Sequence, residues 1–389
     1  MSPDLPHRIL TTHAGSLPRS KRLRELHTRK FRGEAIDEAA LEAEVAAAVA
    51  DVVARQAAAG IDIGNDGEAP RESFFTFVQH RMTGFGGRSA RPTMADMTRY
   101  PGFFEILSRM YLSGDSVSLL AGPKAIGPIA HRGGGEAAAE CARLKAAIAD
   151  AGNPFVDAFM TAPSPGIIAA AMENAHYATL GDYVDALADA LAHDYRAILD
   201  AGLILQIDAP DLAMERHTLF ADKPLSDFLD FVRLVAAAIN RALAGAPSER
   251  VRLHVCWGNY EGPHDLDVPL ADIWPEVSRI RAGGYLISMA NPRHAHEACC
   301  FEAGALPAGA ALIAGVIDTT TNYIEHPEVV AMRIEAAVKA VGNPSRVMAG
   351  TDCGFETSAG FQSVADDVCW AKLASLSEGA KIASGRLFE

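Results

Sequence analysis

A histidine and two cysteines are the residues of this chain best suited to holding a metal ion. His254 and Cys256 stand two positions apart in the apolar stretch VRLHVCW at 251–257, and Cys353 follows far downstream in GTDCG at 350–354. Side chains of a β-strand return to the same face every second residue, so an H-x-C strand presents imidazole and thiolate together. With Cys353 added, three ligands that zinc prefers converge.

Two interpretations of these residues are open at this point. Zinc held by two thiolates and one imidazole keeps a fourth position free, and such a centre can bind and activate a substrate thiol. Unpaired cysteine is also among the most buried residue types and packs as a small apolar side chain, so Cys256 and Cys353 could simply belong to the core. The elements that carry these residues bear on the choice.

Eight short apolar segments, each followed by a polar cluster and separated by alanine-rich helical patterns, are expected to form strands. They begin near Thr11, Ile61, Phe155, Leu203, Val251, Tyr285, Leu312 and Val347, and the first long helix is expected over about 36–59. Alternating strands and helices favour a parallel sheet, and eight such units favour a closed (β/α)8 TIM barrel. Barrel enzymes keep their active sites at the carboxyl ends of the strands, where these polar clusters lie.

The stretch from about 84 to 136 does not fit a simple strand-helix unit. It is rich in glycine at both ends, and residues 117–124 have a hairpin-like pattern. We interpret 84–136 as an excursion inserted between strands two and three, which could serve as a lid or as a subunit contact. Residues 1–389 would then form one barrel domain.

Composition and charge narrow the class of partner. The 389 residues are 49% apolar and 22% charged, with a formal net charge of −14, which disfavours nucleic acid and anionic membranes and favours a small-molecule substrate. Six scattered cysteines do not suggest a disulfide framework. No signal-peptide pattern and no long uncharged apolar run is present, so we expect a cytoplasmic protein without a membrane span. A homo-oligomer stays open.

Five motifs, taken in order along the chain, resemble those of the catalytic barrel of cobalamin-independent methionine synthase. They are TTHAGSLP at 11–18, DGE at 66–68, QIDAP at 206–210, HVC at 254–256 and DCG at 352–354. Further stretches, DAPDLA at 208–213 and NPRHAHE at 291–297, are similar to the single-barrel branch that includes epoxyalkane:coenzyme M transferase. The resemblance implies a (β/α)8 barrel in which His254, Cys256 and Cys353 bind Zn²⁺ and the zinc binds a substrate thiol as thiolate.

One position departs from that family. Its members carry a glutamate zinc ligand on the strand that matches 285–291, and alignment places Ser288 there, with Ala290 as the other register. No carboxylate lies on this strand. Three outcomes are therefore open: three protein ligands with water or substrate as the fourth, recruitment of Cys299 or Cys300, or loss of zinc.

The electrophile in such a reaction needs a proton donor. Methyl transfer from a folate leaves an amine nitrogen, and epoxide opening leaves an alkoxide. The candidate donors at strand ends are Glu68, His13, Asp318 and His326. Glu68, in the DGE motif, is the first choice for a polar contact with the substrate, and its alternative function is to cap the following turn.

Asp208 ends a very apolar strand and needs a cationic partner, either a substrate ammonium or an arginine such as Arg293. The resemblance implies that it holds the amino group of the thiol substrate. Arg293, His294 and His296 could bind an anionic group or serve structural functions instead. The predicted substrate-binding residues are Asp208, Ser16, Arg293, His294, Trp257 and Asn259.

The leading hypothesis is a zinc-dependent enzyme that transfers a methyl or other alkyl group to a thiol. Its partners would be a small-molecule thiol and an alkyl donor. Addition of a thiol to an epoxide is the second hypothesis, and a metal-free barrel acting as a lyase or binding protein is the third. A folate with a polyglutamate tail is disfavoured because a chain of net charge −14 offers few basic residues to hold it.

Overall fold

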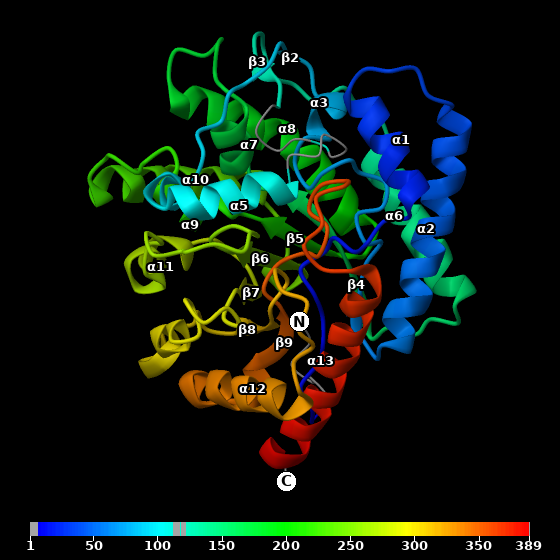
Figure 1. Cartoon of the computed structure of the whole chain (residues 1–389), viewed down its shortest axis with the longest axis vertical. Coiled ribbons are helices and arrows are strands. Elements are labelled where there is room, and N and C mark those ends of the chain that lie inside the picture. The colour runs from blue at the N-terminus through cyan, green and yellow to red at the C-terminus, as the bar shows by residue number, and fades with distance from the viewer. Residues whose placement is uncertain (1–6, 112–116, 118–121, 389) are drawn as a thin grey trace.

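A computed structural model describes residues 7–111, 117 and 122–388. Its centre is a parallel sheet in the order β1-β4-β5-β6-β7-β8-β9 (Figure 1). The strands are β1 (Ile63–Gly64), β4 (Asp157–Pro163), β5 (Ile204–Asp208), β6 (Val251–Val255), β7 (Gly284–Ile287), β8 (Ala311–Ile317) and β9 (Val347–Thr351). Seven of the eight predicted strands are therefore present as strands of one sheet.

The eighth predicted strand, near Thr11, closes this sheet on itself. The Ala349 amide of β9 donates to the Leu10 carbonyl at 2.9 Å, and the Thr12 amide donates back to the Ala349 carbonyl at 2.9 Å. On the other side the Ile63 amide of β1 donates to the Thr11 carbonyl at 3.0 Å. Both edge strands are thus bonded to the same extended segment, and the predicted barrel architecture is confirmed.

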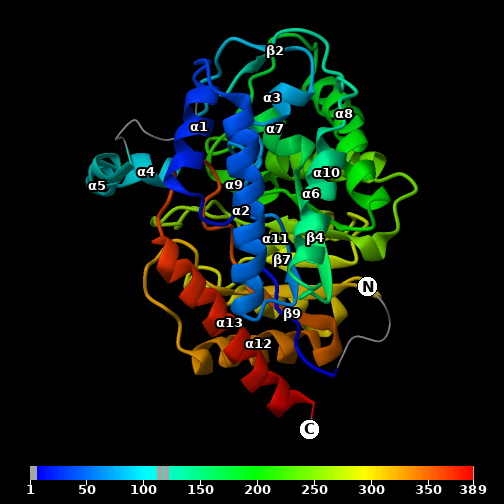
Figure 2. The ribbon, with the colours of Figure 1, turned by 90° about the vertical axis from the view of Figure 1, so that its right-hand side faces the viewer.

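Helices surround the sheet (Figures 1 and 2). The longer ones are α1 (Lys21–Phe31), α2 (Glu38–Ala58), α6 (Glu136–Asp150), α7 (Pro165–Ala171), α8 (Leu180–Asp200), α10 (Leu225–Ala242), α11 (Leu270–Val277), α12 (Pro327–Val341) and α13 (Asp366–Leu387). The shorter ones are α3 (Val78–Arg81), α9 (Asp211–Met214) and the 3-10 turns η1 (Glu215–His217), η2 (Ser248–Arg250), η3 (Glu297–Gly304) and η4 (Pro344–Arg346). Among the described residues, no helix combines the length and apolar run that a bilayer crossing requires.

Helix α8 illustrates why these segments are helical. Its buried positions include Val184, Leu187, Leu191, Tyr195 and Ile198, which recur three or four residues apart and so form one apolar stripe. The Thr179 hydroxyl caps its first turn by accepting from the Asp182 amide at 3.0 Å. The stripe packs on the barrel and on α10, which leaves the polar face of α8 outward.

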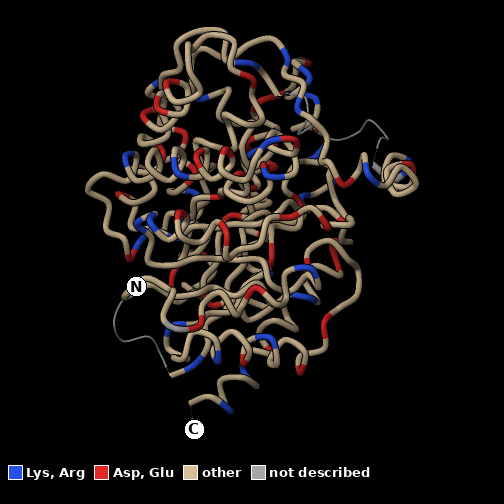
Figure 3. Tube along the Cα trace, turned by 90° about the vertical axis from the view of Figure 1, so that its left-hand side faces the viewer, with Lys and Arg blue, Asp and Glu red and all other residues tan. Residues whose placement is uncertain are grey.

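The excursion at 84–136 has its own small elements between β1 and β4. Its ends are joined by an antiparallel pair, β2 (Phe85–Gly86) with β3 (Lys124–Ala125). Two helices, α4 (Ala95–Arg99) and α5 (Pro101–Tyr111), lie between them, and α5 stands out from the body of the molecule in Figures 2 and 3. Residues 118–121 of the hairpin predicted at 117–124 lie outside the described residues, while Lys124 pairs with Gly86.

A buried ion network ties the loop after β1 to the helices behind it. Glu140 of α6 accepts from Arg71 at 2.9 Å and also binds Arg81, whose guanidinium reaches Asp194 of α8 at 2.8 Å. Burial alone would raise the pKa of Glu140, but the two arginines lower it to about 2. Arg71 further donates to the Thr161 carbonyl of β4 at 2.8 Å. The network therefore anchors the chain that carries Glu68.

Neutralising the centre of this network is expected to destabilise the fold strongly. Glu140→Gln would leave Arg71 buried without its carboxylate and Arg81 with Asp194 alone, and it should lower the free energy of unfolding by about 3–5 kcal/mol. The exposed pair of Asp51 with Arg55 provides the control, since Asp51→Asn should change stability by less than about 0.5 kcal/mol. Urea denaturation of the two variants measures both, and equal small effects would contradict the assignment.

Candidate functional site

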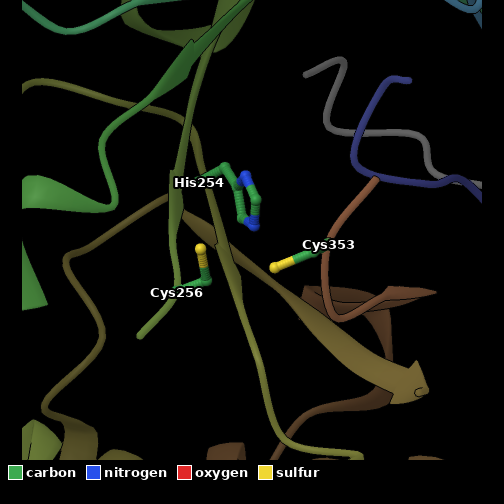
Figure 4. Close-up of side chains that lie close together, drawn as sticks. All are labelled: His254, Cys256 and Cys353. Atoms are coloured by element: carbon green, nitrogen blue, oxygen red, sulfur yellow. The ribbon is translucent and has the colours of Figure 1, made fainter. Parts of the chain in front are cut away.

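The three predicted metal ligands meet at the carboxyl ends of β6 and β9. His254 lies in β6, Cys256 directly follows it, and Cys353 follows β9. One ligand atom from each of these buried side chains lies within 4.8 Å of the others. Figure 4 shows the imidazole and both sulfur atoms pointing toward one another. The period of two along β6 and the parallel register of the barrel bring these residues together as predicted.

Asp208 orients the imidazole of this group. It is paired directly with His254 in the register of β5 and β6, and its Oδ1 lies 3.0 Å from His254 Nδ1. The other ring nitrogen, Nε2, lies 2.9 Å from the Asp352 carbonyl oxygen. A carboxylate on the far nitrogen of a ligating histidine is a common arrangement at metal sites, because it fixes the tautomer and the ring plane. The two sulfurs and the imidazole are ligand types that suit zinc, and Nε2 would have to give up the proton that it shares with the Asp352 carbonyl to bind it.

The partner of Asp208 is thus His254. The alternative that Arg293 would pair with Asp208 was wrong. That side chain is exposed at the barrel rim, where its Nε donates to the His264 carbonyl at 3.2 Å. It follows β7 and not the strands beside β5, so the barrel register holds it away from Asp208. Among the described residues, Arg293 does not line either of the two cavities at the strand ends.

The two thiols affect each other's pKa in opposite directions. The Cys353 thiol donates to Cys256, which lowers the pKa of Cys256 well below its ordinary value and, in the other direction, raises that of Cys353. His254 beside Cys256 lowers the pKa of Cys256 further. A buried thiolate next to an imidazole is the state of cysteine that ligates metals.

Ser288 occupies the place predicted for the missing glutamate. It directly follows β7, its hydroxyl donates to the Asp352 carbonyl at 2.7 Å, and it also hydrogen-bonds Cys353. The alternative position, Ala290, gives only its backbone amide, to Asp352 Oδ1 at 2.9 Å. Cys299 is exposed on η3 and Cys300 is half-buried there, and neither joins the metal-ligand group formed by the described residues.

A pocket of about 540 Å³ opens above the three ligands. Its polar floor contains Glu68, Asp208, His254, Cys256 and Cys353. The rest of its wall is largely apolar and includes Phe74, Met94, Met97, Phe104, Leu107, Val117, Met214 and Phe361, several of them from the excursion. Strand-end residues thus supply the reactive groups, and the excursion supplies part of the cover.

Glu68 reaches this floor from a left-handed backbone conformation, with φ of 56°. Its Oε1 accepts from the Thr161 hydroxyl at 3.0 Å, while Arg19 donates to its carbonyl at 2.9 Å. Gly15 passes so close that a Cβ there would lie 2.5 Å from Glu68 Oε1, so only glycine fits. Burial, followed by the charge of Asp208, raises the pKa of Glu68 to about 7. This carboxyl can carry a proton near neutral pH.

The other predicted proton donors lie in different surroundings. His13 is buried in the barrel wall, where Nε2 is 2.8 Å from Gln56 Oε1 and burial lowers its pKa to about 4. Asp318 follows β8 and accepts from the Thr320 amide and hydroxyl, each at 2.7 Å. His326 is exposed and caps the first turn of α12. Of these three, Asp318 alone lines one of the two cavities formed by described residues.

Of the remaining residues predicted to contact substrate, some line the large pocket and others pack in the structure around it. Ser16 lines the large pocket, and Asn259 lines it while donating to the Gly354 carbonyl at 2.8 Å. Trp257 is buried, donates to the Val268 carbonyl at 2.7 Å and stacks on His294. A smaller cavity of about 20 Å³ lies beside Trp257, His294 and Ser288.

Two residues of the site were missed from the sequence. Arg252 is buried inside the barrel, where it donates to Gln206, Thr12 and the His13 carbonyl. Arg252 stands two residues before His254 and so lies on the same strand face. That spacing could have indicated that its side chain points into the barrel. Asp352 accepts from the backbone amides of residues 289–291, and no local pattern reveals that contact between loops.

Comparison with known proteins gives a consistent result. A sequence model of the family described as "Cobalamin-independent synthase, Catalytic domain" matches residues 9–100. Methionine synthase of Saccharolobus islandicus is 25% identical over 377 residues, covering 96% of this chain and 94% of the relative. Methionine synthase of Saccharolobus solfataricus is 25% identical over 382 residues, with the same coverage.

Solved structures show the same fold. The B12-independent methionine synthase from Shewanella sp. W3-18-1, in complex with selenomethionine, superposes with a TM-score of 0.75 at 21% identity, covering 98% of this chain and 99% of that one. A putative vitamin-B12 independent methionine synthase from Listeria monocytogenes superposes with a TM-score of 0.63 at 20% identity, covering 96% and 98%. The likeness thus extends over nearly the whole length of each chain.

The raised pKa of Glu68 predicts a pH-dependent stability. Its pKa is about 7 in the fold against an ordinary 4.5, so the folded state binds the extra proton between these values and stability falls as pH rises through them. Glu68 should contribute a loss on the order of 3 kcal/mol, which Glu68→Gln removes. Asp211 and Asp352, whose pKa values burial raises to about 7 and about 6, should keep their own contributions in both proteins. Urea denaturation at pH 5 and pH 8 measures the difference. The surface variant Glu25→Gln should follow the wild type, and parallel profiles for wild type and Glu68→Gln would contradict the prediction.

Restoring a carboxylate at position 288 tests the geometry of the proposed zinc centre. Ser288→Glu should raise zinc affinity roughly ten-fold or more, because it adds an anionic oxygen ligand beside Cys353. Chelator competition measures the affinity. Ala290→Glu is the matched variant for the other register and should give no gain; a gain from Ala290→Glu alone would show that the register is misassigned.

Proposed function

Because the chain belongs to the cobalamin-independent synthase-like family, we propose that it is a zinc-dependent transferase that moves a methyl group to the thiol of a small substrate. The observation that carries the proposal is the convergence of His254, Cys256 and Cys353 in the floor of a pocket that also contains Asp208 and Glu68. A structural staple would not require an open pocket above its ligands.

His254, Cys256 and Cys353 would hold the zinc beside the pocket that all three line. An alkyl thiol in water has a pKa near 8.5 or above, and zinc supplies the Lewis acidity that keeps such a sulfur ionised at neutral pH. Asp208 keeps the imidazole of His254 in place through the Nδ1 contact. The apolar wall of the pocket excludes water from the sulfur, which strengthens these electrostatic interactions.

We further propose an amino-acid thiol of the homocysteine type as the acceptor. The relatives are methionine synthases, and one solved neighbour holds selenomethionine. Asp208 lines the pocket, where an ammonium group would offset the charge of its carboxylate. Glu68, with its pKa near 7, is the proton donor within reach of this floor.

The pocket favours a donor that is not polyanionic. Apart from the proposed ligand His254, Arg91 is the basic residue among the described residues that line it, and its guanidinium is already bound to Glu215. The remaining wall is mostly apolar, so a polyglutamate tail would find little to neutralise it. Addition of a thiol to an epoxide, the second hypothesis from the sequence, is not favoured, since the relatives found are methionine synthases.

Removal of one sulfur ligand tests the proposal. Cys353→Ser should lower bound zinc by one equivalent per chain and reduce methylation of homocysteine by roughly 100-fold or more, since the Lewis acid contributes several kcal/mol. Metal analysis and the appearance of the methylated thiol measure the two effects. Cys299→Ser, an exposed cysteine outside the ligand group, is the control and should keep both metal and activity.

The metal-free barrel, the third hypothesis, would be favoured if the wild-type protein binds no metal through its thiolates. The test is made after reconstitution with Zn²⁺ under reducing conditions. The cobalt-substituted protein distinguishes the cases, because only a cobalt ion bound by sulfur gives a thiolate charge-transfer absorption.

A further inference from the structure

A second group of potential metal ligands lies on the loops that follow β6 and β7. Asp267 Oδ2 is 2.8 Å from His264 Nδ1 and 2.8 Å from His294 Nε2. The ligand atoms of these three residues lie within 4.8 Å of one another. On the other side of the same carboxylate, Asp267 Oδ1 is 2.8 Å from His217 Nδ1. Three imidazoles thus surround one buried carboxylate.

The hydrogen bond of His264 Nε2 to the Tyr260 carbonyl determines the protonation of Nδ1, the nitrogen that faces Asp267. Its Nε2 lies 3.0 Å from the Tyr260 carbonyl, which can only accept, so Nε2 carries a proton. In a neutral ring Nδ1 then has a lone pair, which faces a carboxylate oxygen at 2.8 Å. That contact needs either a proton on Nδ1, which makes His264 an imidazolium, or a metal cation that both atoms bind. A ligating histidine commonly donates its far N–H to a backbone carbonyl in this way.

His294 is held in a matching orientation. Its ring stacks on Trp257 with a centroid separation of 3.9 Å and an interplanar angle of 16°. Its Nδ1 has no hydrogen-bond partner among the described residues, and Glu297 is 3.8 Å away. The stacking fixes the ring plane, so Nε2 is aimed at the oxygen of Asp267 that His264 also faces.

A proton or a divalent cation could balance this cluster. One proton on His264 would match the single negative charge of Asp267, with His294 and His217 neutral. His217 is 1% exposed, and neither of its ring nitrogens has a hydrogen-bond partner within the described ranges. The nearby acids Asp96 and Glu297 are also buried. One divalent cation would satisfy neutral imidazole nitrogens and the carboxylate together.

We propose that His264, Asp267 and His294 form a second metal site, separate from the sulfur ligands, for a divalent ion of the zinc class. Two imidazoles and a carboxylate form a donor set that suits Zn²⁺ and its first-row neighbours. Both imidazoles line the small cavity that Ser288 and Cys353 also line. The ion would fix the loop after β6, which brings Asn259 and Tyr260 into the large pocket.

Cobalt loading of the full chain tests this site apart from the proposed catalytic centre. Wild-type protein should bind two equivalents of Co²⁺. His294→Asn should bind one equivalent and keep the thiolate charge-transfer absorption, whereas the double variant Cys256→Ser/Cys353→Ser should bind one equivalent without that absorption. His296→Asn is the matched control: this histidine is on the same loop with a side chain 70% exposed, and its variant should still bind two.

Two results would overturn the proposal. The first is that wild-type protein binds one equivalent of Co²⁺ and the His294→Asn variant still binds that full equivalent. The other is no bound cobalt in the double cysteine variant, which decides the question even where His294→Asn does not fold. Circular dichroism and thermal melting establish that each variant is folded. Absence of the thiolate absorption in wild type would instead count against the zinc transferase alone, so the two proposals fail separately.

Discussion

The hydrogen bond between Asp208 and His254 is the interaction on which the proposed site depends. The barrel pairs these residues across β5 and β6, so the contact is built into the strand register. A shift of one residue in either strand would turn its side chain to the opposite face and break the contact. Because Asp208 occupies Nδ1, the other nitrogen of His254 is directed toward the two sulfurs and the end of β9. The same carboxylate also faces the substrate pocket and raises the pKa of Glu68.

Rigidity around this contact comes from segments far apart in the chain. The strand-like segment at 10–12 joins β9 to β1 and closes the barrel. Glu68 is held in a left-handed conformation, which is costly for a residue with a side chain and persists only where neighbours fix it. Arg19 binds its carbonyl, and Thr161 donates to its carboxyl group. The buried network around Glu140 holds the following loop, so the acid is placed before any substrate arrives.

The sequence predicted those features that follow from short-range periodicity. The spacing of His254 and Cys256 and the strand ends follow from a repeat of two and from the order of elements, whereas the position of Ser288 came from the family resemblance. Contacts between loops could not be predicted in this way. Asp267 meets His217 and His294 only because η1 and the turns after β6 and β7 meet on one rim. His13 carries a reactive side chain at a strand end, yet its ring turns into the wall toward Gln56.

The serine at position 288 has a consequence for both groups of ligands. Its hydroxyl and the imidazoles of His264 and His294 line the same small cavity, which also reaches Cys353. A glutamate there would place a carboxylate between the two groups, within reach of a cation in either. Serine leaves the sulfur site with less negative charge, which favours ionisation of a bound thiol and weakens its attack as a nucleophile. A second cation on Asp267 would add positive charge near the same sulfur and reinforce the first effect. The protein would then depend on the electrophile side of the pocket, where Glu68 can supply a proton, to recover the rate.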